Sequence, residues 1–177
     1  MSTSKSKMVI LGDSHLKGSV PKIDNYLSSK FEVRGFIKPD AGFEKIVGKT
    51  ILASSRLKNK DVFLCNGGGN DVYNTNSKKV ILLIIKFFQG NDKSNIIMLD
   101  TPHRYDLSDN LHVHKDVKTF NSKLKKIAKL FKHITILEFS LTRNCFTQHG
   151  SHLNGYGKGL LAKQPTSLIY KMSFIFA

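Results

Sequence analysis

Short apolar runs alternate with helical stretches along this chain, and that alternation limits its fold more than any other feature. Five such runs are expected to form strands, at residues 8–11, 33–37, 62–64, 96–99 and 134–137. Each is almost continuously apolar, as strands are when helices cover both faces of a parallel sheet. We therefore predict an α/β protein, a three-layer α/β/α sandwich around a five-stranded parallel sheet.

Helical segments are expected between these runs. A first helix closes at residues 24–29, a second spans 44–54, and a third spans 77–89 and ends at Gly90. The fourth, at 114–131, has the clearest pattern. Its apolar side chains recur at spacings of three and four and predict one stripe that faces the core: Val117, Phe120, Leu124, Ile127, Leu130 and Phe131.

The last helix should begin after Asn154 and stop at Pro165, because proline has no backbone N–H to donate. A chain of 177 residues has the size of one domain. We expect a single domain over residues 1–177, with a core at about 8–163 and an irregular tail at 164–177.

The composition is that of a globular protein, with 40% hydrophobic and 23% charged residues. Cys65 and Cys145 are too few for a disulfide scaffold, so both thiols should be free in a reducing compartment. The N-terminal residues lack the apolar region of a signal peptide, and no apolar run is long enough to cross a bilayer. We expect an intracellular protein, cytoplasmic or nuclear.

The charge is strongly positive, since 28 Lys and Arg residues outnumber 13 Asp and Glu residues and give a formal net charge of +15. Seven lysines fill the other faces of the fourth helix: Lys115, Lys118, Lys123, Lys125, Lys126, Lys129 and Lys132. A basic surface attracts RNA or DNA without distinguishing its sequence. The candidate contacts are Lys118, Lys125, Lys126 and Lys129. Solubility explains the same lysines equally well.

Ser14, in the segment Gly12-Asp13-Ser14-His15, comes directly after the first strand. Ligands of parallel sheets bind beyond the carboxyl ends of the strands. A serine at the entrance of the next helix lies where backbone N–H groups stabilise developing negative charge. Taken alone, such a segment is more often an ordinary turn that Asp13 or Ser14 caps.

Asn70, in the glycine-rich segment 67–71, follows the third strand. An asparagine amide is a neutral donor suited to an oxyanion, although a glycine-rich turn with Asn in the left-handed conformation is also common. His149 and His152 precede the last helix, and histidine is the usual general base. The alternatives are surface histidines or a zinc site. Zinc is disfavoured because no cysteine pair or carboxylate lies at ligand spacing to complete a set with His103, His112 or His114. We expect neither a metal nor a cofactor.

The order and spacing of these three segments, from Met8 to about Leu161, resemble the SGNH (GDSL-like) hydrolase family. The resemblance implies a flavodoxin-like fold. It makes Ser14 the nucleophile and His152 the base. It also makes the amide of Asn70 an oxyanion donor.

Two positions depart from the family pattern. In the second block, Lys38-Pro39-Asp40-Ala41-Gly42, Asp40 stands where related sequences have glycine, so the backbone oxyanion donor is expected at Asp40 or Gly42. His149 stands where the family has the aspartate that orients the base. The missing aspartate implies a Ser14–His152 dyad or an incomplete triad.

Three further segments, at residues 102–107, 120–124 and 146–154, are similar to the SGNH-like esterase domains encoded in non-LTR retroelements. The C-terminal domain of the Oskar protein is a related case, in which the fold has lost catalysis and binds RNA. The resemblance therefore implies a serine esterase that acts on a small ester or acyl substrate. The alternative is a weak or inactive module that binds RNA or DNA through its basic surface.

Overall fold

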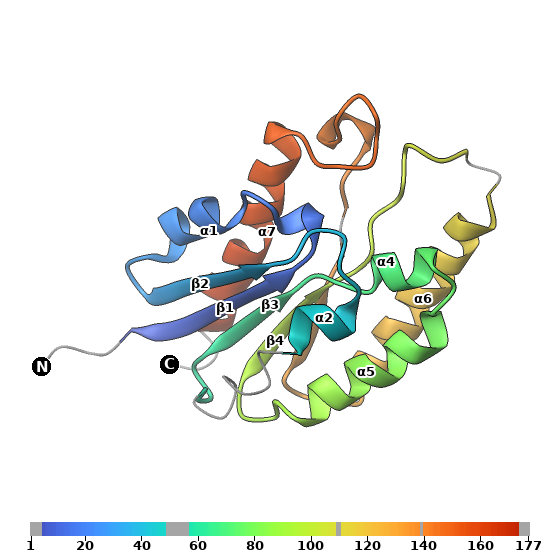
Figure 1. The fold of residues 1–177 in the computed structure, drawn as a ribbon. Helices are drawn as coiled ribbons and strands as arrows, with labels where there is room; N and C mark the ends of the chain where they lie inside the picture. Colours follow the sequence, from blue (N-terminus) through green and yellow to red (C-terminus); the bar gives the residue numbers. More distant parts are fainter. Residues whose placement is uncertain (1–4, 49–56, 109–110, 139, 174–177) are drawn as a thin grey trace, which may run out of the picture.

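The computed structural model describes residues 5–48, 57–108, 111–138 and 140–173 (Figure 1). Five strands form one sheet in the order β2-β1-β3-β4-β5, and every neighbouring pair is parallel. The strands are β1 (Ser6–Gly12), β2 (Phe31–Ile37), β3 (Val62–Cys65), β4 (Asn95–Leu99) and β5 (Ile134–Leu137). The predicted five-stranded parallel sheet is confirmed.

Helices cover both faces of the sheet and make three layers (Figure 1). One face carries α2 (Phe43–Val47), α4 (Gly69–Tyr73), α5 (Ser77–Gln89) and α6 (His112–Ala128). The other carries α1 (Val20–Leu27) and α7 (Gly155–Ser173). Two short 3-10 helices, η1 (Ser14–Leu16) and η2 (Arg143–Cys145), lie in loops.

The core has two parts, one on each side of the sheet. Within β1, Val9 and Leu11 contact the α5–α6 side, whereas Met8 and Ile10 contact the α1–α7 side. Side chains of a strand alternate between its faces, and both faces are covered here. The sequence of a buried strand is therefore apolar at successive positions.

Two helices start and end differently from the sequence prediction. The helix α1 begins at Val20, and α2 ends at Val47, short of the predicted 44–54; residues 49–56 of that prediction lie outside the described residues. The helix α6 ends at Ala128, so Leu130 falls beyond it and is 80% exposed. The prediction that Leu130 faces the core is wrong. None of the described helices is long and apolar enough to cross a membrane.

The helix α7 continues through Pro165 to Ser173, whereas the sequence predicts an interruption and an irregular end. An internal proline costs a helix about 3 kcal/mol. Burial of Leu161, Ala162 and Ile169 against the sheet offsets that cost, since each buried aliphatic side chain contributes roughly 1.5–3 kcal/mol. The Thr166 hydroxyl also donates to a backbone carbonyl of the preceding turn at 2.7 Å.

Candidate active site

Ser14 lies in the turn that follows β1, at the carboxyl edge of the sheet, and is half-buried. Asp13 is the N-cap of η1, because its carboxylate accepts a hydrogen bond from the His15 N–H at 3.0 Å. The sequence allowed either Asp13 or Ser14 as the cap, and the structure shows that it is Asp13. Among the described residues, neither the N–H nor the hydroxyl of Ser14 makes a hydrogen bond. Both groups are therefore available to a substrate.

The Asp13 carboxylate joins the Ser14 turn to the loop after β3. It is 3% exposed, and its Oδ1 also accepts from Asn66 Nδ2 at 3.2 Å. The imidazole Nδ1 of His15 lies 3.1 Å from the same oxygen. A buried carboxylate with several partners is costly to disturb. Asp13 thus anchors the turn that presents Ser14.

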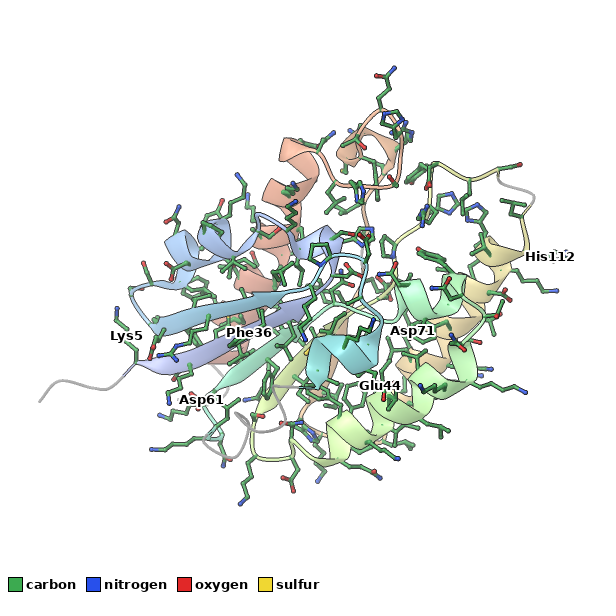
Figure 2. The ribbon with its side chains drawn as sticks, in the orientation of Figure 1. Lys5, Phe36, Glu44, Asp61, Asp71 and His112 are labelled. Atoms are coloured by element: carbon green, nitrogen blue, oxygen red, sulfur yellow. The ribbon has the colours of Figure 1, made fainter. Side chains whose placement is uncertain are left out.

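The loops after β2 and β3 meet beside this turn. Asn70 donates its Nδ2 to the carbonyl of Ala41 at 3.1 Å. Asp71 Oδ2 accepts from the backbone N–H of Phe43 at 2.8 Å, and Figure 2 shows Asp71 between α4 and α2. The second and third blocks of the sequence pattern are therefore in contact. One N–H of the Asn70 amide remains for another acceptor.

The loop after β2 offers two backbone donors. Asp40 is exposed and has a φ of 58°, in the left-handed region, while Gly42 is the N-cap of α2. Within the described residues neither N–H makes a hydrogen bond, whereas the N–H of Ala41 donates to the Lys38 carbonyl at 3.3 Å. Lys38 in turn donates its N–H to the carbonyl of Gly12, at the end of β1, at 2.8 Å. Both predicted donors are free and lie in a loop bonded to the Ser14 strand.

Gly68 holds the left-handed position of the glycine-rich turn, with a φ of 99°. A Cβ at Gly68 would lie 2.8 Å from Cζ of Phe120, so only glycine fits this turn against α6. Asn70 lies in the short helix α4 instead. The sequence alternative that placed Asn70 in the left-handed conformation is wrong.

His152 and His149 lie in the loop that precedes α7, and both side chains are exposed. Phe146 and Leu153 form an antiparallel bridge across this loop, and the N–H of Thr147 donates to the His152 carbonyl at 2.8 Å. Among the described residues, no hydrogen bond joins His152 to Ser14 or to His149.

A second loop, between β4 and α6, packs against the His152 loop. Gly150 has a φ of 82°, and a Cβ there would lie 2.6 Å from the carbonyl carbon of Tyr105 and 2.8 Å from the nitrogen of Asp106. The N–H of Tyr105 donates to the Gly150 carbonyl at 3.2 Å. The close backbone approach requires glycine at position 150 and brings Asp106 to the loop that carries His152.

Arg104 binds Asp106 with two nitrogens, one of them Nε at 2.6 Å from Oδ1. These hydrogen bonds hold the pKa of Asp106 below its ordinary value of 3.8, and the charge of His152 acts in the same direction. Arg104 also lies over the ring of Tyr73, with Cζ 4.9 Å from the ring centre. Burial raises the pKa of Tyr73 to about 12, so its phenol is neutral.

Sequence patterns assign no role to Tyr73, Arg104 or Asp106. Their position shortly after β3 and β4, at the edge where parallel sheets bind ligands, is the signal that could have identified them. Asp106 is the residue among them whose carboxylate acts on His152, since the charge of His152 contributes to the lowered pKa of Asp106.

The histidines of the zinc alternative do not gather into one site. His103 stacks on His114 with ring centres 4.2 Å apart, while His112 is exposed at the start of α6 (Figure 2). Among the residues that the structure describes, no three His, Cys, Asp or Glu side chains come together as metal ligands.

The predicted nucleic-acid contacts lie on and just after α6, away from Ser14. Lys118, Lys126 and Lys129 are exposed, and Lys125 pairs with Glu138 at 2.8 Å. A role for them in binding RNA or DNA stays a prediction.

No protein-family model and no curated protein sequence matches the chain, but solved structures do. A member of the lipolytic G-D-S-L family from Veillonella parvula superposes with a TM-score of 0.77 at 15% identity, covering 92% of this chain and 97% of its own. The chain has the SGNH (GDSL-like) hydrolase fold.

Two further structures with this fold are similar to the chain. A psychrotrophic esterase from Pseudoalteromonas has a TM-score of 0.71 at 15% identity, covering 95% of this chain and 98% of its own. A family 3 carbohydrate esterase from Clostridium thermocellum has a TM-score of 0.70 at 16% identity, covering 96% and 99%. Such identities establish the SGNH fold and leave the chemistry to be argued from the residues.

Proposed function

We propose that this protein is a serine ester hydrolase of the SGNH type, with Ser14 as nucleophile and His152 as general base. The observation that supports the proposal is that the Ser14 turn and the loops after β2 and β3 lie together at the carboxyl edge of the sheet. Hydrogen bonds connect β1 to Lys38 and Asn70 to Ala41, while Ser14 retains a free hydroxyl. Acyl transfer requires a nucleophile with neutral hydrogen-bond donors close to it.

Catalysis follows from the chemistry of these groups. The Ser14 oxygen attacks the ester carbonyl while His152 accepts the hydroxyl proton, a step favoured by histidine's capacity for proton transfer near neutral pH. The N–H of Ser14, the N–H of Asp40 or Gly42, and the Asn70 amide donate to the oxyanion, and one such donor is worth about 100–1000-fold in rate. His152 then protonates the leaving alcohol, and water repeats the sequence to release the acid.

Asp106 is the positioning residue that compensates for His149. Its carboxylate lies on the loop that packs against Gly150, and Gly150 is two residues before His152. Arg104 keeps the carboxylate ionised, so it stabilises protonated His152 during proton transfer. The resemblance to retroelement esterase domains agrees with this function and supplies no substrate.

The proposal is tested by hydrolysis of short p-nitrophenyl esters. Ser14→Ala should abolish turnover, while Ser28→Ala, an exposed serine after α1, should leave it unchanged. Circular dichroism and thermal unfolding must match in both variants. Equal activity of wild type and Ser14→Ala would show that another group is the nucleophile.

A further inference from the structure

A second concave surface lies at the opposite edge of the sheet from Ser14. It is a cleft of about 720 Å³ at the amino ends of β1 and β3, beside the loop that leads into β4. Figure 2 places Lys5 and Asp61 together at this edge. Five lysines line it, and we call it the lysine cleft: Lys5, Lys7, Lys58, Lys60 and Lys93.

Asp61 is the one acid in the lining of the lysine cleft, and its charge is directed into the protein. It is 6% exposed. Its Oδ1 accepts from the backbone N–H of Lys7 at 2.7 Å, and its Oδ2 accepts from that of Lys58 at 2.8 Å. Backbone donors therefore occupy both carboxylate oxygens, and the lysine ammonium groups are left without this counter-charge.

All five lysines of the cleft are exposed. Within the described ranges none of them forms an ion pair with a carboxylate. Lys5 donates to the carbonyl of Ser28 at 2.6 Å, where the dipole at the carboxyl end of α1 favours a positive charge. Five like charges around one hollow repel one another, and that repulsion is relieved when an anion binds among them.

The floor of the cleft is ordered by hydrogen bonds. The N–H of Asp61 donates to the Lys58 carbonyl at 2.8 Å, and the N–H of Asn95 donates to the Asp61 carbonyl at 3.1 Å. The Asn95 side chain also donates to the Asn59 carbonyl at 2.8 Å. The loop that carries Lys58 and Lys60 is thus fixed to β4, which lowers the entropy lost when a ligand binds.

We infer that the lysine cleft binds a ligand with several closely spaced phosphate groups. Lysine ammonium groups bind phosphate as point charges, and a volume of this size accommodates a ligand of nucleotide dimensions. The ligand is either a single-stranded nucleic acid, held by its backbone, or a small oligophosphate. A concave site lined by five lysines without carboxylate partners among the described residues concentrates positive charge on one ligand, whereas Lys125 of α6 is paired with Glu138. The inference is independent of ester hydrolysis, because the cleft lies at the far edge of the sheet.

The experiment compares two triple variants with the same change of charge. One is Lys58→Glu, Lys60→Glu, Lys93→Glu in the cleft, and the matched control is Lys118→Glu, Lys126→Glu, Lys129→Glu on α6. Fluorescence anisotropy measures binding of a labelled oligothymidylate of about 12 nucleotides, a length within known single-strand site sizes. Calorimetry measures binding of inorganic tripolyphosphate. Thermal unfolding establishes that both variants are folded.

Affinity for the oligothymidylate should fall at least tenfold in the cleft variant and less than about twofold in the α6 variant. The salt dependence of binding should weaken in the cleft variant by about 0.7 in slope for each phosphate that its side chains no longer neutralise. If tripolyphosphate also binds in a cleft-dependent manner and displaces the oligonucleotide, free oligophosphate is the minimal ligand. If only the oligonucleotide binds, the ligand is a nucleic-acid strand.

Three results would overturn the inference. The first is an equal loss of affinity in both variants, which would assign binding to net charge alone. The second is the absence of binding of either probe even at low salt. The third is cleft-dependent binding of anionic lipid vesicles when both phosphate probes fail, which would make the partner a membrane surface.

Discussion

Around Ser14 the polar side chains are buried and hydrogen-bonded to one another, whereas around His152 they are exposed. Asp13 and Asn66 are each 3% exposed and bonded together, at the ends of two central strands. His152 lies in a solvent-exposed loop, and Asp106 reaches it from another loop. We call these the nucleophile half and the base half of the site.

The difference shows which half of the proposed site can accept a change of residue at little cost to the fold. Strand ends fix the nucleophile half, so its residues must satisfy packing as well as chemistry. The base half depends on contact between two loops, and an acid can enter it from either one. The exposed half is therefore where His149 could replace the usual aspartate without cost to the fold.

The largest effect is expected for the base itself. His152→Ala should lower kcat/KM about 1000-fold, within the range that general base catalysis contributes. His112→Ala, a histidine exposed at the start of α6, is the control and should have no effect. Steady-state hydrolysis of p-nitrophenyl acetate measures both. A loss below threefold in His152→Ala would remove this residue from the mechanism.

A substitution in the nucleophile half should lower the free energy of unfolding. Asp13→Ala leaves the donors of His15 and Asn66 without their acceptor and should reduce the free energy of unfolding by about 1–3 kcal/mol. Asp106→Ala, in the base half, should reduce it less, because solvent partly screens the ion pair between Arg104 and Asp106, whose side chain is 21% exposed. Urea unfolding followed by circular dichroism distinguishes them. Equal losses would mean that the two halves are held equally firmly.

Removing the charge of Asp106 should lower activity while leaving stability intact. Asp106→Asn should reduce kcat about tenfold with KM unchanged. This fall in kcat is smaller than that caused by loss of a buried triad aspartate, because solvent partly screens the charge of Asp106. Steady-state kinetics measures kcat and KM separately and so separates an effect on catalysis from an effect on substrate binding. Asp92→Asn, an exposed acid before β4, is the control. An unchanged kcat in a folded Asp106→Asn protein would mean that Asp106 only holds the two loops together and has no part in catalysis.

The smallest effect, a rise of a few fold, is expected from His149→Asp. A carboxylate at the family position would fix the tautomer of His152 and stabilise its protonated form. The same change should restore most of the activity that Asp106→Asn removes. Lower activity of a folded His149→Asp protein would give His149 a role of its own.

Sequence patterns predicted the parts of this molecule that local chemistry determines. Apolar runs predicted all five strands, and in β1, β3 and β4 burial on both faces is the reason. The edge strand β2 is mostly exposed, and its apolar residues are interrupted by Arg34 and Gly35. The helix beyond Pro165 was missed, since the burial of Ile169 against the sheet cannot be deduced from the residues around the proline. Asp106 was missed for a similar reason: its nearness to His152 depends on the packing of Gly150, a contact between loops far apart in the chain. Strand-end motifs predicted that the Ser14 turn and the loop of Asn70 lie at one edge of the sheet, whereas the proposed role of Asp106 rests on a contact between loops that the sequence does not reveal.

Covalent labelling of the nucleophile tests the central claim most directly. The protein is incubated with an alkyl fluorophosphonate, which phosphonylates a base-activated serine with loss of fluoride, and the modified peptide is identified by mass spectrometry. We predict one adduct, on Ser14, that is absent in His152→Ala and persists at a lower rate in Asp106→Asn. An unlabelled Ser14 in a protein that still hydrolyses esters, or an adduct on another serine, would contradict the account.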